Sequence, residues 1–162
     1  MNNSIIGKHK FELDTPCLVI DKTKLIDNIK LMQEFSQAKG KQVRPHTKTH
    51  KCPDICKLQL DYKSIGISIT KPIEALELTK VGLKNLLITS PIVTNKKCEA
   101  LAKILRISPE TIVITDSLAN VEQLNTLGEQ LQQKINILID IDTDISRTGI
   151  SFTAAFKLAI VS

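Results

Sequence analysis

Short aliphatic runs alternate with amphipathic segments along this chain. The runs recur roughly every 20 to 26 residues, and their length is typical of buried strands. They lie at Gln42-Val43-Arg44, Ile65–Ile69, Leu86-Leu87-Ile88, Thr111–Ile114 and Ile135–Ile141. Between several runs the apolar residues repeat with helical spacing, as at Leu25, Ile29, Met32 and Phe35. This alternation predicts βα units around a parallel sheet, because parallel strands need crossover connections.

Capping residues indicate where the helices begin and end. Side chains that accept backbone N–H groups favour helix starts, proline suits the first turn, and glycine suits the end. On this basis Asp21 and Gly40 delimit a first helix, Pro53 and Pro72 begin two others, and Gly82 ends one of these. Asp116 or Ser117 begins a helix that carries Leu118, Val121, Leu124, Leu127 and Leu131, and a last helix runs from Ser151 through Phe152, Phe156 and Ala159.

The polar residues after each run favour a barrel over an open sheet. Ligands of βα barrels gather where the strands end, and polar side chains follow these runs at His46 to Lys48, Thr70 and Thr89, for example. The chain has neither a G-x-G-x-x-G nor a Walker-type run, which open nucleotide-binding sheets usually carry. We therefore predict an α/β fold, a partial (β/α)8 barrel with about five βα units. Since eight units need about 250 residues, we expect a fragment.

The segment Asp14-Thr15-Pro16-Cys17-Leu18-Val19-Ile20-Asp21 also has the pattern of a strand, placed before the first helix. No helix connects it to an earlier strand, so we expect it to join another sheet. The predicted division is a leading segment at 1–20 and an incomplete barrel at 21–162.

Composition narrows the function classes. The 162 residues are 42% hydrophobic and 24% charged, which disfavours disorder and a membrane span. The start of the chain lacks the layout of an export signal, so the four cysteines are expected to be reduced thiols in the cytoplasm. The net charge of +5 lies entirely in residues 1–60, which hold 11 basic against 6 acidic residues. Five aromatic residues offer few platforms for stacking nucleic-acid bases.

The richest stretch chemically is Arg44-Pro45-His46-Thr47-Lys48-Thr49-His50-Lys51, which follows a predicted strand directly. A lysine that attacks an aldehyde must be neutral, and nearby cations favour the neutral amine. We therefore expect Arg44 and Lys51 to crowd Lys48 and to activate it. The same cations suit a phosphorylated cofactor such as pyridoxal 5'-phosphate, and His46 lies on the same side at strand spacing.

Other interpretations of these residues stay open. The basic stretch could be a solvated loop, or a nucleic-acid contact. His46, His50, Cys52 and Cys56 are ligand types for zinc, although their spacing is compact. An acidic run resembles the start of a calcium loop, at Asp140-Ile141-Asp142-Thr143-Asp144. However, Ile145 and Ser151 stand where a calcium loop needs glycine and glutamate. We expect the three carboxylates to alternate along a strand and Asp142 to anchor the turn that aims Arg147 over the sheet end. An ion pair of Arg147 with Asp142 or Asp144 is the competing interpretation.

These residues together resemble a known group. The motifs are residues 14–21, the run from Arg44 to Pro53, Thr70 to Ala75, and Ile139-Asp140-Ile141-Asp142 leading to Arg147-Thr148-Gly149. The chain resembles the N-terminal part of fold-type III pyridoxal-phosphate enzymes of the D-threonine aldolase and D-serine dehydratase group, which share the alanine racemase N-terminal type of barrel. The resemblance covers nearly all of the chain.

This resemblance implies a site and an activity. Lys48 matches the lysine that forms the aldimine with pyridoxal phosphate, Arg147 matches the arginine near the cofactor's phenolic oxygen, and His46 falls in the same motif. It implies a lyase acting on small D-3-hydroxyamino acids, by retro-aldol cleavage or dehydration, in a homodimer. The leading strand would join a β-rich second domain that carries a divalent metal. The alternative is a non-catalytic protein that binds pyridoxal phosphate on the same barrel.

Overall fold

The fold is built from short parallel strands separated by helices. The structure is a computed structural model that describes residues 5–161. In chain order the elements are α1 (Lys22–Ala38), α2 (Pro53–Asp61), β1 (Ile67–Ile69), α3 (Pro72–Lys80), β2 (Leu86–Ile88), α4 (Asn95–Ile107), β3 (Ile112–Thr115), α5 (Leu118–Leu131), β4 (Asn136–Ile139) and α6 (Phe152–Val161). Two 3-10 turns, η2 (Lys10–Glu12) and η3 (Thr47–Thr49), precede β1. Among the described residues, no helix is both long and apolar enough to cross a membrane.

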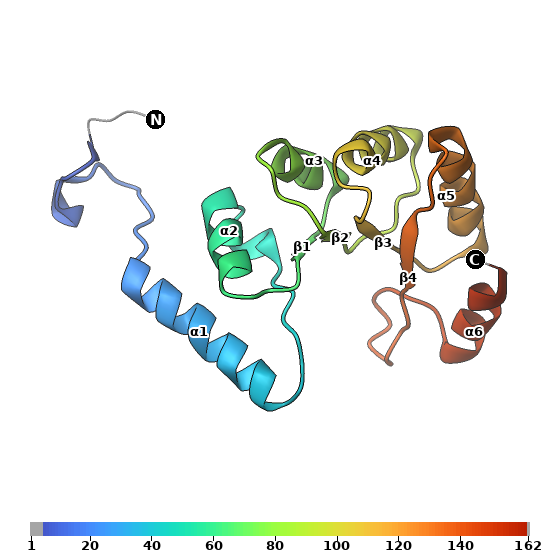
Figure 1. The fold of residues 1–162 in the computed structure, drawn as a ribbon, viewed down its shortest axis with the longest axis horizontal. Helices are drawn as coiled ribbons and strands as arrows, with labels where there is room; N and C mark the ends of the chain where they lie inside the picture. The colour runs from blue at the N-terminus through green and yellow to red at the C-terminus, as the bar shows by residue number, and fades with distance from the viewer. Residues whose placement is uncertain (1–4, 162) are drawn as a thin grey trace.

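The strands form one parallel sheet in the order β1-β2-β3-β4. Helices α3, α4 and α5 lie in a row along one side of this sheet, each packed on the next (Figure 1). A doubly wound sheet carries helices on both faces, whereas a βα barrel carries them on the outside only. The arrangement confirms the predicted α/β fold as part of a barrel.

The core lies between the sheet and this row of helices. Its members are fully buried aliphatic side chains, namely Ile67, Ile69, Leu86, Ile88 and Val113 from the strands and Leu101, Ile104 and Leu105 from α4. Burying each such side chain contributes about 1.5–3 kcal/mol, so the strands are held firmly at the centre. The residues that directly follow β1 and β2 therefore project from a rigid base.

The predicted helix signals are confirmed at most ends. Asp21 caps α1 by accepting the Lys24 N–H at 3.1 Å, and Ser117, rather than Asp116, caps α5. Pro53 and Pro72 occupy the first turns of α2 and α3. The sequence pattern did not delimit α4, which Thr94 caps through the Lys97 N–H.

Two of the predicted strands differ from expectation. Residues 42–44 form no regular strand, although the Val43 and Pro45 carbonyls accept from Ile65 and Ser68 at 2.9 and 2.8 Å. Proline has no N–H to donate, so pairing with β1 shrinks to the isolated bridge between His46 and Ser68. The strand at 135–141 is shorter, and β4 is only partly buried because it is the last strand of the described sheet.

The leading segment forms no strand within the described residues. Leu18, Val19 and Ile20 are 101%, 58% and 59% exposed, so their apolar side chains are largely uncovered in this part of the protein. A strand needs a partner for its backbone groups, and the described residues supply none here. The assignment of this segment to a second domain stays a prediction.

Candidate active site

The turn η3 places Lys48 at the carboxyl end of the sheet. The edge segment at 43–46 runs beside β1, and the chain then turns at Thr47, which is 2% exposed. His46 caps this turn, since its Nδ1 accepts the Lys48 N–H at 3.0 Å. The His46 ring thus holds the backbone N–H of Lys48, which follows the buried Thr47, while the Lys48 side chain is exposed.

The His46 ring reaches across the ends of two strands. Its Nε2 lies 3.2 Å from Oγ1 of Thr89, which follows β2, and 3.3 Å from Oγ1 of Thr70, which follows β1. Partial burial and then the positive charge of Lys48 lower the pKa of His46, while Glu74 acts in the opposite direction. The surroundings therefore favour the neutral imidazole.

A folded-back loop after β4 carries Arg147. Asp142 holds the turn before Arg147, because its Oδ1 accepts the N–H groups of both Ile145 and Ser146 at 3.0 Å. The loop closes where Ile150 N–H donates to the Asp140 carbonyl at 3.0 Å. Asp142 thus anchors the turn, as predicted. Among the described residues no carboxylate pairs with Arg147, so its guanidinium is available to a ligand.

These parts enclose one cleft, which we call the rim cleft. It has a volume of about 490 Å³ and lies beyond the carboxyl ends of the strands. Its lining includes His46, Lys48, Thr70, Thr89, Asp142 and Arg147. The volume is in the range of small-molecule sites. All three residues that the sequence nominated as site residues, Lys48, His46 and Arg147, therefore lie together, although about 100 residues separate the first two from the third.

The expected crowding of Lys48 by two cations is wrong. The Arg44 guanidinium points to the opposite end of the sheet, where it donates to the Asn85 carbonyl at 2.6 Å and to Asn85 Oδ1 at 3.2 Å. Lys51 Nζ pairs with Glu74 Oε1 at 2.7 Å. Successive turns in the segment send these side chains in different directions, which the linear motif does not reveal.

The metal interpretations find no support in the geometry. Within residues 5–161, no three His, Cys, Asp or Glu side chains gather as a metal site. Of the four zinc-type residues, Cys56 is fully buried in the core and the Nδ1 of His50 accepts the Cys52 N–H at 3.1 Å. The acidic run does not alternate along a strand as expected, because β4 ends at Ile139 and Asp144 has a positive φ of 68°.

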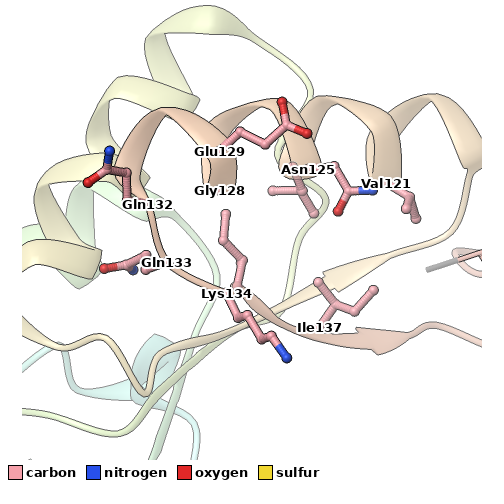
Figure 2. A pocket seen from close by; sticks show the side chains of 10 residues that line it. Val121, Asn125, Gly128, Glu129, Gln132, Gln133, Lys134 and Ile137 are labelled. Carbon is pink, nitrogen blue, oxygen red and sulfur yellow. The ribbon is translucent and has the colours of Figure 1, made fainter.

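A larger hollow lies elsewhere, between α5 and β4. Figure 2 shows Val121 and Asn125 of α5 above Ile137 of β4, and the hollow has a volume of about 610 Å³. It flanks the last strand of the described sheet, the position that a further βα unit covers in a closed barrel. Its charged residues, Glu129 and Lys134, form no cluster with a nucleophile, so we place the candidate active site in the rim cleft.

Sequence reasoning placed Thr70 and Thr89 at strand ends but did not find their contact with His46. The available signal was a hydroxyl residue directly after each of two adjacent aliphatic runs. Two neighbouring parallel strands end at the same edge, so their following residues can share one partner.

The fold and the rim cleft define a class: the first part of a βα barrel whose strand ends place a lysine, an imidazole and a guanidinium around one cleft. The model of the family "Alanine racemase, N-terminal domain" matches residues 20–160. The chain belongs to this family, which confirms the predicted fold-type III resemblance.

Individual relatives agree with the family. The chain is 30% identical over 146 residues to a 3-hydroxy-D-aspartate aldolase of Paracoccus denitrificans, covering 90% of this chain and 38% of the relative. It is 30% identical over 138 residues to a D-threo-3-hydroxyaspartate dehydratase of Delftia sp., covering 85% and 36%. The crystal structure of D-threonine aldolase from Filomicrobium marinum superposes with a TM-score of 0.88 at 28% identity, covering 92% and 40%. The chain thus spans about two fifths of the length of these relatives.

Proposed function

We propose that this chain is the N-terminal, lysine-bearing part of a pyridoxal-phosphate-dependent lyase that acts on D-3-hydroxyamino acids. The carrying observation is the rim cleft, which brings Lys48, His46 and Arg147 together. The similar proteins named above are aldolases and a dehydratase, which supports a lyase. The intact protein would then cleave the Cα–Cβ bond or eliminate water.

The residues of the rim cleft fit this cofactor chemically. Pyridoxal phosphate supplies an aldehyde for covalent attachment and a ring that accepts the electrons released at the substrate's Cα. Lys48 offers the exposed primary amine that such an attachment needs, at a fixed point of the backbone. The guanidinium of Arg147, which pairs with no carboxylate among the described residues, offers donors to a negatively charged oxygen, and His46 lines the same cleft as the Lys48 amine.

Each residue has a proposed role in the cleft. Lys48 would hold the cofactor through its side-chain amine, and the same amine, when not attached, could accept or deliver a proton at the substrate's Cα. Arg147 would offer its guanidinium to the cofactor's ring oxygen, and Asp142 keeps the Arg147 turn in place. His46, which lines the same cleft, would lie beside the cofactor ring.

The proposed protein extends beyond the rim cleft. Residues 21–162 belong to the incomplete barrel, and residues 1–20 are a leading segment whose strand would join a second, β-rich domain that carries a divalent metal. The intact protein is a cytoplasmic homodimer that binds no nucleic acid. Four free thiols at Cys17, Cys52, Cys56 and Cys98 are in keeping with that compartment.

Covalent trapping tests the proposal. The intact protein is incubated with pyridoxal phosphate, reduced with borohydride and digested, and the labelled peptide is identified by mass spectrometry. We expect the label on Lys48, and a Lys48→Gln variant should lose the label together with about 10²-fold or more of its turnover. Lys51→Gln is the matched control, since Lys51 pairs with Glu74 in the same loop and should leave the label in place.

Turnover of D-threonine and D-serine with added divalent metal completes this test. A label on another lysine would remove the proposed role of Lys48. A label on Lys48 without any turnover would instead support the non-catalytic cofactor-binding protein.

A further inference from the structure

The contacts of His46 determine where its proton lies. Its Nδ1 accepts the Lys48 N–H at 3.0 Å, so this nitrogen carries a lone pair and no hydrogen. In a neutral imidazole the single hydrogen is then on Nε2. That nitrogen faces the hydroxyl oxygens of Thr89 and Thr70 at 3.2 and 3.3 Å.

The proton of Thr89 is also assigned by its neighbours. Its Oγ1 donates to the carbonyl of Ile69, the last residue of β1, at 3.1 Å. The oxygen is therefore free to accept from Nε2–H of His46. A chain of hydrogen bonds thus runs in one direction, from the Lys48 N–H through the imidazole and the Thr89 hydroxyl to the backbone of β1.

We propose that Thr89, assisted by Thr70, is a positioning residue that locks His46 in the Nε2–H tautomer and thereby fixes the backbone of Lys48 in the rim cleft. Both threonines project from the ends of buried strands, so they are rigid supports. The opposite tautomer would set an Nδ1–H against the Lys48 N–H and would release the cap of η3. This inference deepens the proposed function and rests on it for the role of Lys48.

The test reads the tautomer directly. The intact protein is labelled with 15N-histidine, and the ring signals of His46 are those that disappear in His46→Gln. We expect a pure Nε2–H pattern in the wild type at pH 7. In the Thr70→Val/Thr89→Val double variant, which removes both acceptors without changing side-chain shape, we expect a mixture of tautomers and about tenfold weaker binding of pyridoxal phosphate. Thr70→Ser/Thr89→Ser should restore both.

Thr115→Val is the matched control. Thr115 ends β3 as a fully buried threonine, and its hydroxyl contacts the Ser117 carbonyl at 3.4 Å rather than His46. This variant should keep the tautomer and the affinity. An Nδ1–H or doubly protonated His46 in the wild type, or a pure Nε2–H pattern in the double valine variant, would overturn the inference. Because the tautomer is read without cofactor, that outcome is distinct from a failed label on Lys48.

Discussion

Arg44 and Lys48 lie at opposite ends of the sheet, although only three residues separate them. Arg44 clamps the Asn85 loop at the amino end, while Lys48 lines the rim cleft at the carboxyl end. In βα barrels the carboxyl end carries the chemistry and the amino end contributes stability. Substitution of Arg44 should therefore affect stability, whereas substitution of Lys48 should affect cofactor binding.

Replacing Arg44 is expected to change stability and leave cofactor binding intact. Arg44→Gln removes hydrogen bonds from a charged donor to Asn85, so the free energy of unfolding should fall by about 1.5–3 kcal/mol. Denaturant unfolding of the intact protein measures this loss. Lys41→Gln, an exposed cation in the same segment, should change it by less than about 0.5 kcal/mol. Weaker cofactor binding without loss of stability would place Arg44 in the site after all.

A glycine is required at position 66, next to the hydrogen bonds between Arg44 and Asn85. It precedes β1 with a φ of 152°, and a Cβ there would overlap the Arg44 guanidinium and the Asn85 carbonyl. Gly66→Ala should therefore destabilise the protein by about 2–4 kcal/mol, seen as a lower Tm. Gly82→Ala provides the comparison, because its φ of 86° is also positive but nothing lies within 4 Å of its Cβ position. An equal loss in both variants would show that backbone conformation, and not the clamp, makes glycine necessary.

Thiol reactivity should separate the cysteines. Burial raises the pKa of the Cys56 thiol to about 11, and the side chain is fully buried in the core. Cys52, at the start of the same helix, is only half-buried. With iodoacetamide at pH 8, mass spectrometry should find Cys52 alkylated faster than Cys56, since the thiolate is the reacting species and needs access. Alkylation of Cys56 at a comparable rate in the folded protein would contradict its place in the core.

Stability is expected to fall as the pH drops below neutrality. Burial lowers the pKa of both His46 and His50 in the folded state, so the unfolded chain takes up their protons first, near pH 6.5. Their contribution is therefore fully present above about pH 6.5 and is lost as the pH falls toward their folded values.

Denaturant titrations between pH 5 and 8 measure this slope. His46→Gln and His50→Gln should each reduce the proton uptake on unfolding by at most about one proton in this window. An unchanged slope in both variants would mean that neither imidazole is held neutral by the fold. His9→Gln serves as the control, since His9 lies exposed in the leading segment.

The elements of the fold were largely predictable. The alternation of aliphatic runs and amphipathic segments located the strands of the sheet, and Asp21, Pro53 and Pro72 marked helix starts, because these signals depend on local backbone chemistry. The predicted strand at 42–44 does not form a regular ladder with β1, and the sequence already contains the reason, because Pro45 has no N–H to donate. The partial exposure of β4 could not be predicted, because it depends on which strand lies at the end of the described sheet.

For the site, the sequence by itself determined which groups are present: an amine, imidazoles and a guanidinium, each in a segment that follows a predicted strand. Only the tertiary structure decided which of them meet. Parallel strands end at a common edge, so residues as distant as His46 and Thr89, or Lys48 and Arg147, come together there. Arg44 and Lys51, close to Lys48 along the chain, are turned away by contacts with Asn85 and Glu74. Side-chain direction depends on partners from other elements, and no spacing along the chain encodes it.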